Sequence, residues 1–169
     1  MIELIRDLVM QQNFLPQNGF SFNVDRLPNI SFFAQTANIP GVSKQFTEVL
    51  TPFKTIYRPG DRLTYDDLTL TIRSDENMEA FLEIFNWMSA LARVEGFEKY
   101  KLLTAGDGLY SDASLMILNT KKNPKIQFTF EELFPIQLGQ MTMDSSASDL
   151  TYATFDVTFK YTGYTIKTL

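Results

Sequence analysis

The chain contains neither cysteine nor histidine among its 169 residues. Their absence excludes disulfides, metal sites built from thiolate or imidazole, cysteine nucleophiles and any Ser-His-Asp triad. It does not tell whether the protein works in an oxidising or a reducing compartment, because a protein without cysteine fits both. Carboxylates and lysines remain as groups for acid–base chemistry, but no spacing in the sequence nominates a pair of them. An enzyme is therefore the least favoured class of function.

The sequence also lacks a long apolar run and a basic N-terminal region. The first segment, MIELIRDLVMQQ, carries Glu3 and Asp7 within its apolar pattern, unlike a secretory signal. No later stretch is long and apolar enough to span a bilayer as a helix. We therefore expect a soluble protein that is not exported by the usual route and has no membrane partner.

Basic residues are in the minority. The 15 lysines and arginines are outnumbered by 20 aspartates and glutamates, which gives a net charge of -5 and a pI near 4.7. Such a balance repels phosphate groups, so it opposes a broad electrostatic grip on nucleic acid.

Apolar and aromatic residues, in contrast, are plentiful. Hydrophobic residues make up 44% of the chain, which includes 15 phenylalanines and 7 tyrosines. This is enough for a substantial core, and neither internal repeats nor low-complexity tracts divide the sequence. We predict a single domain over residues 1–169.

Alternating apolar and polar residues predict most of the extended structure. The clearest strand runs from Leu68 to Ile72, and Phe20 to Val24 is a half-buried strand. Ile30 to Thr36 is a natural hairpin partner for the second of these. Three further strands are predicted at Ala113 to Asn119, Lys125 to Glu131 and Thr154 to Tyr161. The predicted fold is mainly β, a sandwich or barrel of antiparallel strands.

One long helix is predicted beside these strands. Ser74 is its candidate N-cap, and an apolar stripe extends from there to Ala92. This stripe is widened by a second apolar set, made up of Ile84, Trp87 and Leu91. Two faces of the helix are therefore expected to need cover. The first dozen residues have the spacing of a short amphipathic helix. Residues 95–111 are polar with little periodicity and indicate a long loop.

Prolines interrupt the segment from Ile39 to Pro59 and argue against a regular strand throughout it. We predict an excursion with extended pieces, ending in a turn at Pro59-Gly60-Asp61. Its apolar residues do not fit one face of a strand: Phe46, Val49, Leu50, Phe53, Ile56 and Tyr57.

The acidic groups have simple structural explanations. Asp61, Asp66 and Asp67 are oxygen donors of the kind that calcium prefers, but their spacing matches no EF-hand loop. Glu131 and Glu132 are adjacent, and adjacent residues of a strand point to opposite faces. Neither group is predicted to bind a metal or to catalyse a reaction.

The remaining candidate motifs are weaker. Gly106-Asp107-Gly108 lacks the strand-to-helix context and the lysine of a phosphate-binding loop. Lys121, Lys122 and Lys125 surround a probable turn at Asn123-Pro124 and do not form a convincing nucleic-acid site. The phenylalanines fall at strand-core positions, so we assign them to packing rather than to base stacking. No catalytic, cofactor-binding or metal-binding residue is predicted.

Several short segments occur in an informative order along nearly the whole chain. They are Gly19-Phe20-Ser21-Phe22-Asn23-Val24, Asn38-Ile39-Pro40-Gly41, Gly60-Asp61-Arg62, Tyr65 to Ile72, Asp75-Glu76, Phe85-Asn86-Trp87, Leu133-Phe134-Pro135 and Phe155-Asp156-Val157-Thr158-Phe159. No single segment is diagnostic, but the ordered set, at this chain length, resembles the tail tube proteins of contractile-tailed bacteriophages. The chain departs from that pattern around Gly106 and in the tail Gly163 to Leu169.

The resemblance implies a β-sandwich or barrel with a flanking helix, six copies of which close into a ring. Rings would stack into a hollow tube through which DNA passes during ejection, without specific binding. It further implies a virion tail component, assembled in the host cytoplasm, with sheath, baseplate and tape-measure proteins as partners and no cofactor. Residues 42–58 would be an arm to a neighbouring subunit or ring. Candidate subunit contacts are Phe46, Val49, Leu50, Phe53, Ile56, Tyr57, Ile84, Trp87 and Leu91.

Three alternatives remain open at this point. The chain has the features of a baseplate or neck protein that initiates or terminates a tube of the same fold. It equally fits the tube protein of a contractile secretion machine. From a different class, its aromatic residues would suit a β-barrel module that binds a small apolar ligand.

Overall fold

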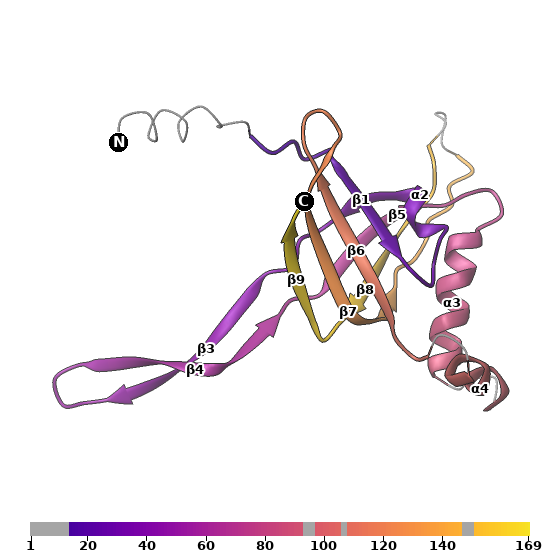
Figure 1. The fold of residues 1–169 in the computed structure, drawn as a ribbon. Helices are drawn as coiled ribbons and strands as arrows, with labels where there is room; N and C mark the ends of the chain where they lie inside the picture. Colours follow the sequence, from indigo (N-terminus) through magenta and orange to yellow (C-terminus); the bar gives the residue numbers. More distant parts are fainter. Residues whose placement is uncertain (1–13, 93–96, 106–107, 147–150) are drawn as a thin grey trace.

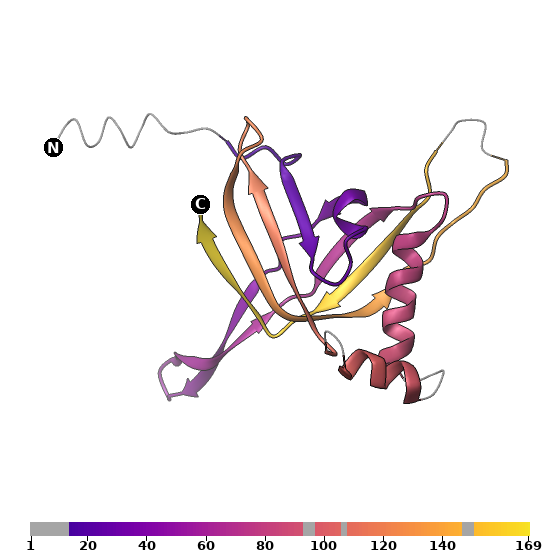
Figure 2. The same ribbon diagram turned by 45° about the vertical axis from the view of Figure 1, so that its right-hand side comes forward.

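The computed structural model describes residues 14–92, 97–105, 108–146 and 151–169. A β-sheet body carries a long helix along one side, and a two-stranded hairpin projects far from the body (Figure 1, and turned by 45° in Figure 2). The helix predicted in the first dozen residues lies outside the described part of the chain.

The first layer of the body is an antiparallel sheet. β1 (Phe20–Val24) pairs with β6 (Ser111–Leu118), and β6 pairs with β7 (Pro124–Leu138). β9 (Gly163–Thr168) then pairs with the first half of β7. The tail from Gly163, which sequence periodicity left beyond the last predicted strand, is thus a regular strand.

The second layer shares β7 with the first. The second half of β7 pairs with β8 (Thr154–Lys160). β8 pairs in turn with β5 (Leu68–Arg73), and β5 pairs with β2 (Ala34–Ala37). β7 changes sheets at Glu132, whose φ of 55° is left-handed. Such a bend suits the corner of a sandwich or barrel. The predicted mainly β, antiparallel fold is confirmed.

The core lies between the two layers and follows the alternation of the strands. Leu68, Leu70 and Ile72 of β5 are fully buried, while the residues between them face outward. β6 and β8 show the same pattern. The predicted strands at 20–24, 68–72, 113–119, 125–131 and 154–161 all correspond to strands of the structure.

The long helix α3 (Glu79–Leu91) begins later than predicted. Met78 precedes it with a left-handed φ of 55°, and the Asp75 carboxylate accepts a hydrogen bond from the Glu79 N–H at 3.0 Å. Ser74 instead donates its hydroxyl hydrogen bond to the carbonyl of Asp75. The capping function therefore belongs to Asp75, because a carboxylate suits the positive end of a helix.

Two other local predictions were wrong. Residues 30–36 form one helical turn, α2 (Ile30–Phe33), followed by β2, which pairs with β5 and not with β1. The turn at α2 carries the chain from one layer to the other, so no hairpin forms. Within the predicted loop 95–111, α4 (Phe97–Ala105) is helical and lies against the end of α3 (Figure 1).

The excursion from Ile39 to Pro59 is more regular than predicted. β3 (Val42–Leu50) and β4 (Thr55–Tyr65) form one long antiparallel hairpin, which we call the arm, residues 42–65. The predicted turn at Pro59-Gly60-Asp61 lies inside β4, where the register shifts between Lys44 and Phe46. A proline is tolerated in this position because the hairpin has two edges and an irregularity in its ladder.

Candidate assembly surface

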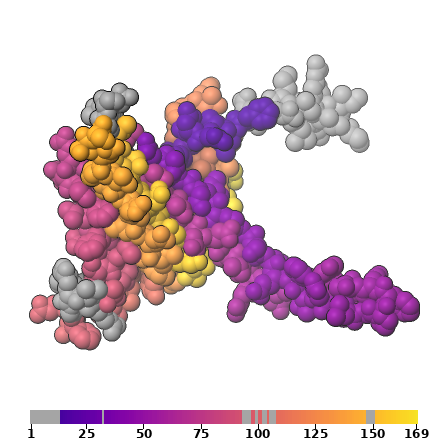
Figure 3. All heavy atoms as spheres, turned by 180° about the vertical axis from the view of Figure 1, so that it is seen from behind, coloured from indigo at the N-terminus to yellow at the C-terminus, as the bar shows by residue number. Residues whose placement is uncertain are grey.

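The arm has no core of its own. All nine residues of β3 are exposed, and so are those of β4 except Gly60 and Tyr65. Phe53 at the tip is 98% exposed, Leu50 beside it 79% and Phe46 61%. Large apolar side chains at this exposure are unusual for a surface with no partner. The space-filling view shows the arm standing clear of the body (Figure 3).

Apolar side chains occur on both faces of the arm. Phe46 and Leu50 share one face with Tyr57, and the Phe46 and Tyr57 rings meet edge to face at 5.6 Å. Val49 and Ile56 are register partners on the opposite face. Because strand residues alternate, neither face of the arm is purely polar.

The structure separates the predicted contact residues into two groups. The six on the arm are exposed: Phe46, Val49, Leu50, Phe53, Ile56 and Tyr57. On α3, Ile84 is 0% exposed and Trp87 3%, while Leu91 is partly buried against the core. Ile84 and Trp87 are therefore corrected to core residues of the chain itself. They offer no surface to a neighbour.

The outer face of α3 carries a different pair. Leu82 is 49% exposed and Phe85 50%, although both lie in the apolar stripe for which the sequence predicts cover. The helix instead buries Ala80, Ile84, Trp87 and Ala90. The error arises because α3 is apolar on two faces, and periodicity alone does not tell which face meets the sheet.

Trp87 illustrates how the core side of α3 is held. Its indole N–H donates to the carbonyl of Leu109 at 3.4 Å, and the guanidinium of Arg26 lies 5.2 Å from its ring centre. Arg26 also donates to the carbonyl of Gly108 at 2.7 Å. These contacts join α3 to the start of β6 and to the end of β1.

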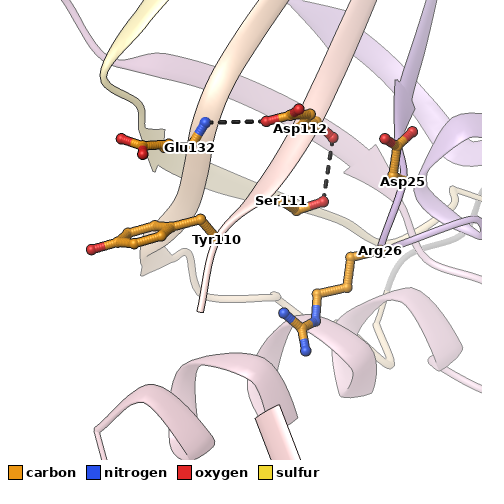
Figure 4. Close-up of a pocket in the computed structure, with 6 residues that line it drawn as sticks. All are labelled: Asp25, Arg26, Tyr110, Ser111, Asp112 and Glu132. Atoms are coloured by element: carbon orange, nitrogen blue, oxygen red, sulfur yellow. Dashed lines mark hydrogen bonds between the residues drawn. The ribbon is translucent and has the colours of Figure 1, made fainter. Parts of the chain in front are cut away.

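A polar hollow of about 440 Å³ opens beside these contacts, lined by Asp25, Arg26, Tyr110, Ser111, Asp112 and Glu132 (Figure 4). The Asp112 carboxylate accepts from the Glu132 N–H at 3.2 Å. Arg26 points from the hollow toward α3. Asp112 thus stabilises the bend of β7.

The other chemical motifs have structural roles. Asp67 forms an ion pair with Lys160, and the amine of Lys122 donates to the carbonyl of Asn18 at 3.0 Å. Thr162 donates its hydroxyl hydrogen bond to Glu132. Across the residues that the structure describes, no group of three or more His, Cys, Asp or Glu side chains is placed to hold a metal ion. In the same residues, no helix is long and apolar enough to cross a membrane.

Sequence reasoning missed one surface, the outer face of the first sheet. Two cross-strand rows run over it: Ser21, Met116, Gln127 and Lys167, and beside them Asn23, Ser114, Thr129 and Thr165. Six of these eight side chains carry a hydroxyl or an amide group, and the other two are Met116 and Lys167. Only strand pairing reveals these rows, because the strands that contribute to them are far apart in sequence.

Residues 5–167 match the phage tail tube protein family. A tail tube protein of Serratia phage KSP90 is 26% identical over 145 residues, which cover 85% of this chain and 78% of that protein.

Solved structures support the fold. A chain of the extended sheath–tube complex of the extracellular contractile injection system PVC has a TM-score of 0.67 at 12% identity, covering 96% of this chain and 97% of its own length. A chain of the tube-terminating cap of the anti-feeding prophage also has a TM-score of 0.67, at 14% identity, covering 94% and 93%. These likenesses concern the fold alone. Since the family match extends over nearly the whole sequence, the chain belongs to the phage tail tube protein family, a family of structural proteins of the virion tail.

Proposed function

We propose that this chain is the repeating subunit of a contractile phage tail tube. Six copies close into a ring, rings stack into a hollow tube, and DNA leaves the virion through the lumen. The observation that carries this proposal is the arm, which beyond its base at Tyr65 exposes apolar side chains on both of its faces.

The energetics of the arm favour a covered state. Burying one large apolar side chain stabilises an assembly by about 1.5 to 3 kcal/mol, and several such side chains lie along the arm. Because they occupy both faces, the arm is suited to insertion between two neighbouring surfaces. A copy in the same ring and a copy in the adjacent ring together supply two such surfaces.

The sheet edges support ring closure. In the part of the chain that the structure describes, β9 pairs with β7 alone and leaves its other edge open. An open edge binds a further strand readily. A contact between one edge of a copy and a different edge of the next is heterologous, and such contacts form rings when the rotation closes.

We assign the outer face of the first sheet to the lumen. Of the eight side chains in its two rows, six carry a hydroxyl or an amide group and one, Lys167, is a cation. Phosphate binding depends on lysine and arginine, so this face would let DNA slide without holding it. The acidic balance of the chain acts in the same direction. The remaining partners follow from the family and its neighbours: a sheath around the tube, a baseplate at its end and a tape-measure protein within it.

Electron microscopy of the purified protein over a range of concentrations tests the proposal. Rings with six-fold averages, or long hollow tubes, are expected as the concentration rises. Averaged images would also place the first sheet relative to the lumen. A monodisperse monomer at every concentration, also in the presence of baseplate components, contradicts the proposal.

A second candidate function is termination of the tube. It is favoured by the likeness to a chain of a tube-terminating cap, whose TM-score equals that of the sheath–tube neighbour. A terminator would form single rings that bind the end of a tube and never stack on themselves. Particle length in the same images distinguishes the two functions.

A further inference from the structure

The arm joins the body through two short legs, residues 38–41 and residues 66–67. The legs are bonded to each other, since the Asp66 N–H donates to the carbonyl of Gly41 at 3.0 Å. The Asn38 side chain crosses between the legs as well, donating to the carbonyl of Asp67 at 3.1 Å and accepting from the Thr69 N–H at 2.6 Å. Thr69 belongs to β5, and Asp67 forms an ion pair with Lys160 of β8, so the legs are held to each other and to the body at these points.

Two tyrosines from the C-terminal part of the chain hold one leg each. The Tyr161 hydroxyl donates to the carbonyl of Asp66 at 2.8 Å, and the Tyr164 hydroxyl donates to the carbonyl of Pro40 at 3.2 Å. Tyr161 follows the end of β8, and Tyr164 lies in β9. The two hydroxyls therefore tie both legs to the same corner of the sheet.

The tyrosine rings are themselves fixed. The ring of Tyr65, the last residue of β4, lies 6.0 Å from that of Tyr161 and 5.4 Å from that of Tyr164. Phe130 lies 5.0 Å from Tyr161 and 5.6 Å from Tyr164, and it is fully buried. The cluster thus connects the base of the arm to the core through edge contacts between rings.

A lever of this length makes the angle at its base important. At a rise of about 3.3 Å per residue, the 9 residues of β3 span roughly 26 Å. A tilt of about 10° at the base would move the tip by roughly 4.5 Å, which is about the spacing between two strands. An arm free to swing by this amount would miss its partner surface or lose entropy when it docks.

We propose that Tyr161 and Tyr164 act as a clamp that sets the direction of the arm before assembly. They are positioning residues: their hydroxyls donate to the legs, and the arm makes the contact with the neighbour. The proposal rests on the proposed function for its role in assembly. The rigidity of the arm in the free subunit is a separate property, which is measured separately.

The test removes the two hydroxyls and keeps the rings, in the double variant Tyr161→Phe/Tyr164→Phe. The control is Tyr110→Phe/Tyr152→Phe, which removes two hydroxyls from rings packed elsewhere, on Phe134 and under Arg73. Because the chain has no cysteine, spin labels attach only at introduced sites. Lys54→Cys at the tip and Thr120→Cys in a turn of the body report the direction of the arm, with labelled chains diluted in unlabelled ones.

We expect a narrow distribution of label distances in the otherwise unchanged chain and in the control, and a distribution at least twice as wide in the clamp variant. The melting temperature should stay within a few degrees, because the rings still pack. The concentration needed to form tubes should rise several-fold in the clamp variant only. Equal distance widths in the clamp and control variants overturn the clamp.

If the clamp variant has a wider distribution of label distances but assembles as well as the unmodified chain, the two tyrosines do not position the arm for assembly. Failure of the unmodified chain to form tubes contradicts the proposed function, and the distance widths then decide the clamp alone.

Discussion

At the scale of residues, the same side-chain type has different roles according to where the backbone places it. Phe130 is fully buried in the core, whereas Phe53 is almost fully exposed at the tip of the arm. Trp87 packs under Arg26 inside the chain, and Phe85, two residues earlier, points outward. Hydrophobicity states what a side chain gains from burial, but the fold decides whether the partner is its own chain or another.

Replacing Trp87 with alanine should destabilise the chain by about 3 to 5 kcal/mol, because the side chain is buried and a cavity would remain. Phe85→Ala on the exposed face should cost about 1 kcal/mol or less. Urea denaturation of both variants measures the difference. Similar losses for the two would show that Trp87 does not contribute to the core as the structure indicates.

We predict that the Tyr161 hydroxyl makes the free energy of unfolding fall at alkaline pH. Burial raises the pKa of Tyr161 well above its ordinary value of 10.0, and Tyr164 and Asp66 add to the shift. In the unfolded chain this group ionises near pH 10, while the folded chain keeps the proton. The stability it contributes is complete below pH 10 and is lost as pH rises toward the folded pKa.

Unfolding midpoints in urea between about pH 9 and about pH 11 should therefore fall less steeply for Tyr161→Phe than for the unmodified chain. Tyr57→Phe on the exposed arm serves as the control and should retain the steep fall. Equal slopes for all three proteins would contradict a raised pKa at Tyr161.

At the scale of elements, alternation predicted the strands well where one face is buried and the other exposed. Leu68 to Ile72 is such a case, and its burial pattern reproduces the sequence pattern. β9 was missed because Ile166 is 62% exposed at a sheet edge, so little burial marks its periodicity. α4 was missed because its apolar and polar residues do not separate into faces.

The arm shows a further limit of prediction. Its apolar residues fall on both faces of the hairpin and Pro59 lies within β4, so the sequence shows no alternation of apolar and polar residues there. The pairing of β3 with β4 became visible only in three dimensions. Conversely, the prediction that these side chains contact another subunit was based on their failure to fit one face, and it stays a prediction.

If both faces of the arm are covered in the tube, one substitution on either face should impair assembly. Phe46→Ser and Ile56→Ser lie on opposite faces. Each should raise the concentration needed for tube formation about tenfold or more, since about 1.4 kcal/mol corresponds to a factor of ten. Melting temperatures should change little, because neither side chain packs in the core.

Thr47→Ser on the same arm is the matched control and should assemble normally. Sedimentation at graded concentrations gives the threshold for each variant. If only one face responds, the arm is covered on one side, and the proposal of insertion between two surfaces is wrong.

At the scale of the whole molecule, the body has a buried core, whereas parts of the surface expose large apolar side chains. The layers share a continuous core, while within residues 14–92, 97–105, 108–146 and 151–169 most of the arm, the second edge of β9 and the outer face of α3 are exposed. Sequence composition indicates the acidic balance of the chain. It did not indicate which surfaces would be left open, because that depends on strand order.

The net charge predicts that salt favours assembly. Copies with a charge of -5 repel one another when they are brought together. Raising the ionic strength shortens the screening length from about 30 Å at 0.01 M to about 8 Å at 0.15 M. The concentration needed for tubes should fall several-fold over this range, as measured by light scattering. A threshold that rises with salt would indicate that ion pairs, rather than apolar contacts, dominate the interface.

The bend of β7 at Glu132 has a mechanical consequence. One strand of 15 residues serves both layers, pairing with β6 and β9 before the bend and with β8 after it. A force that pulls the layers apart must therefore stretch a covalent chain as well as separate packed side chains. The two layers therefore cannot separate along β7 without unfolding this strand, and we expect the body to resist pulling as a single unit.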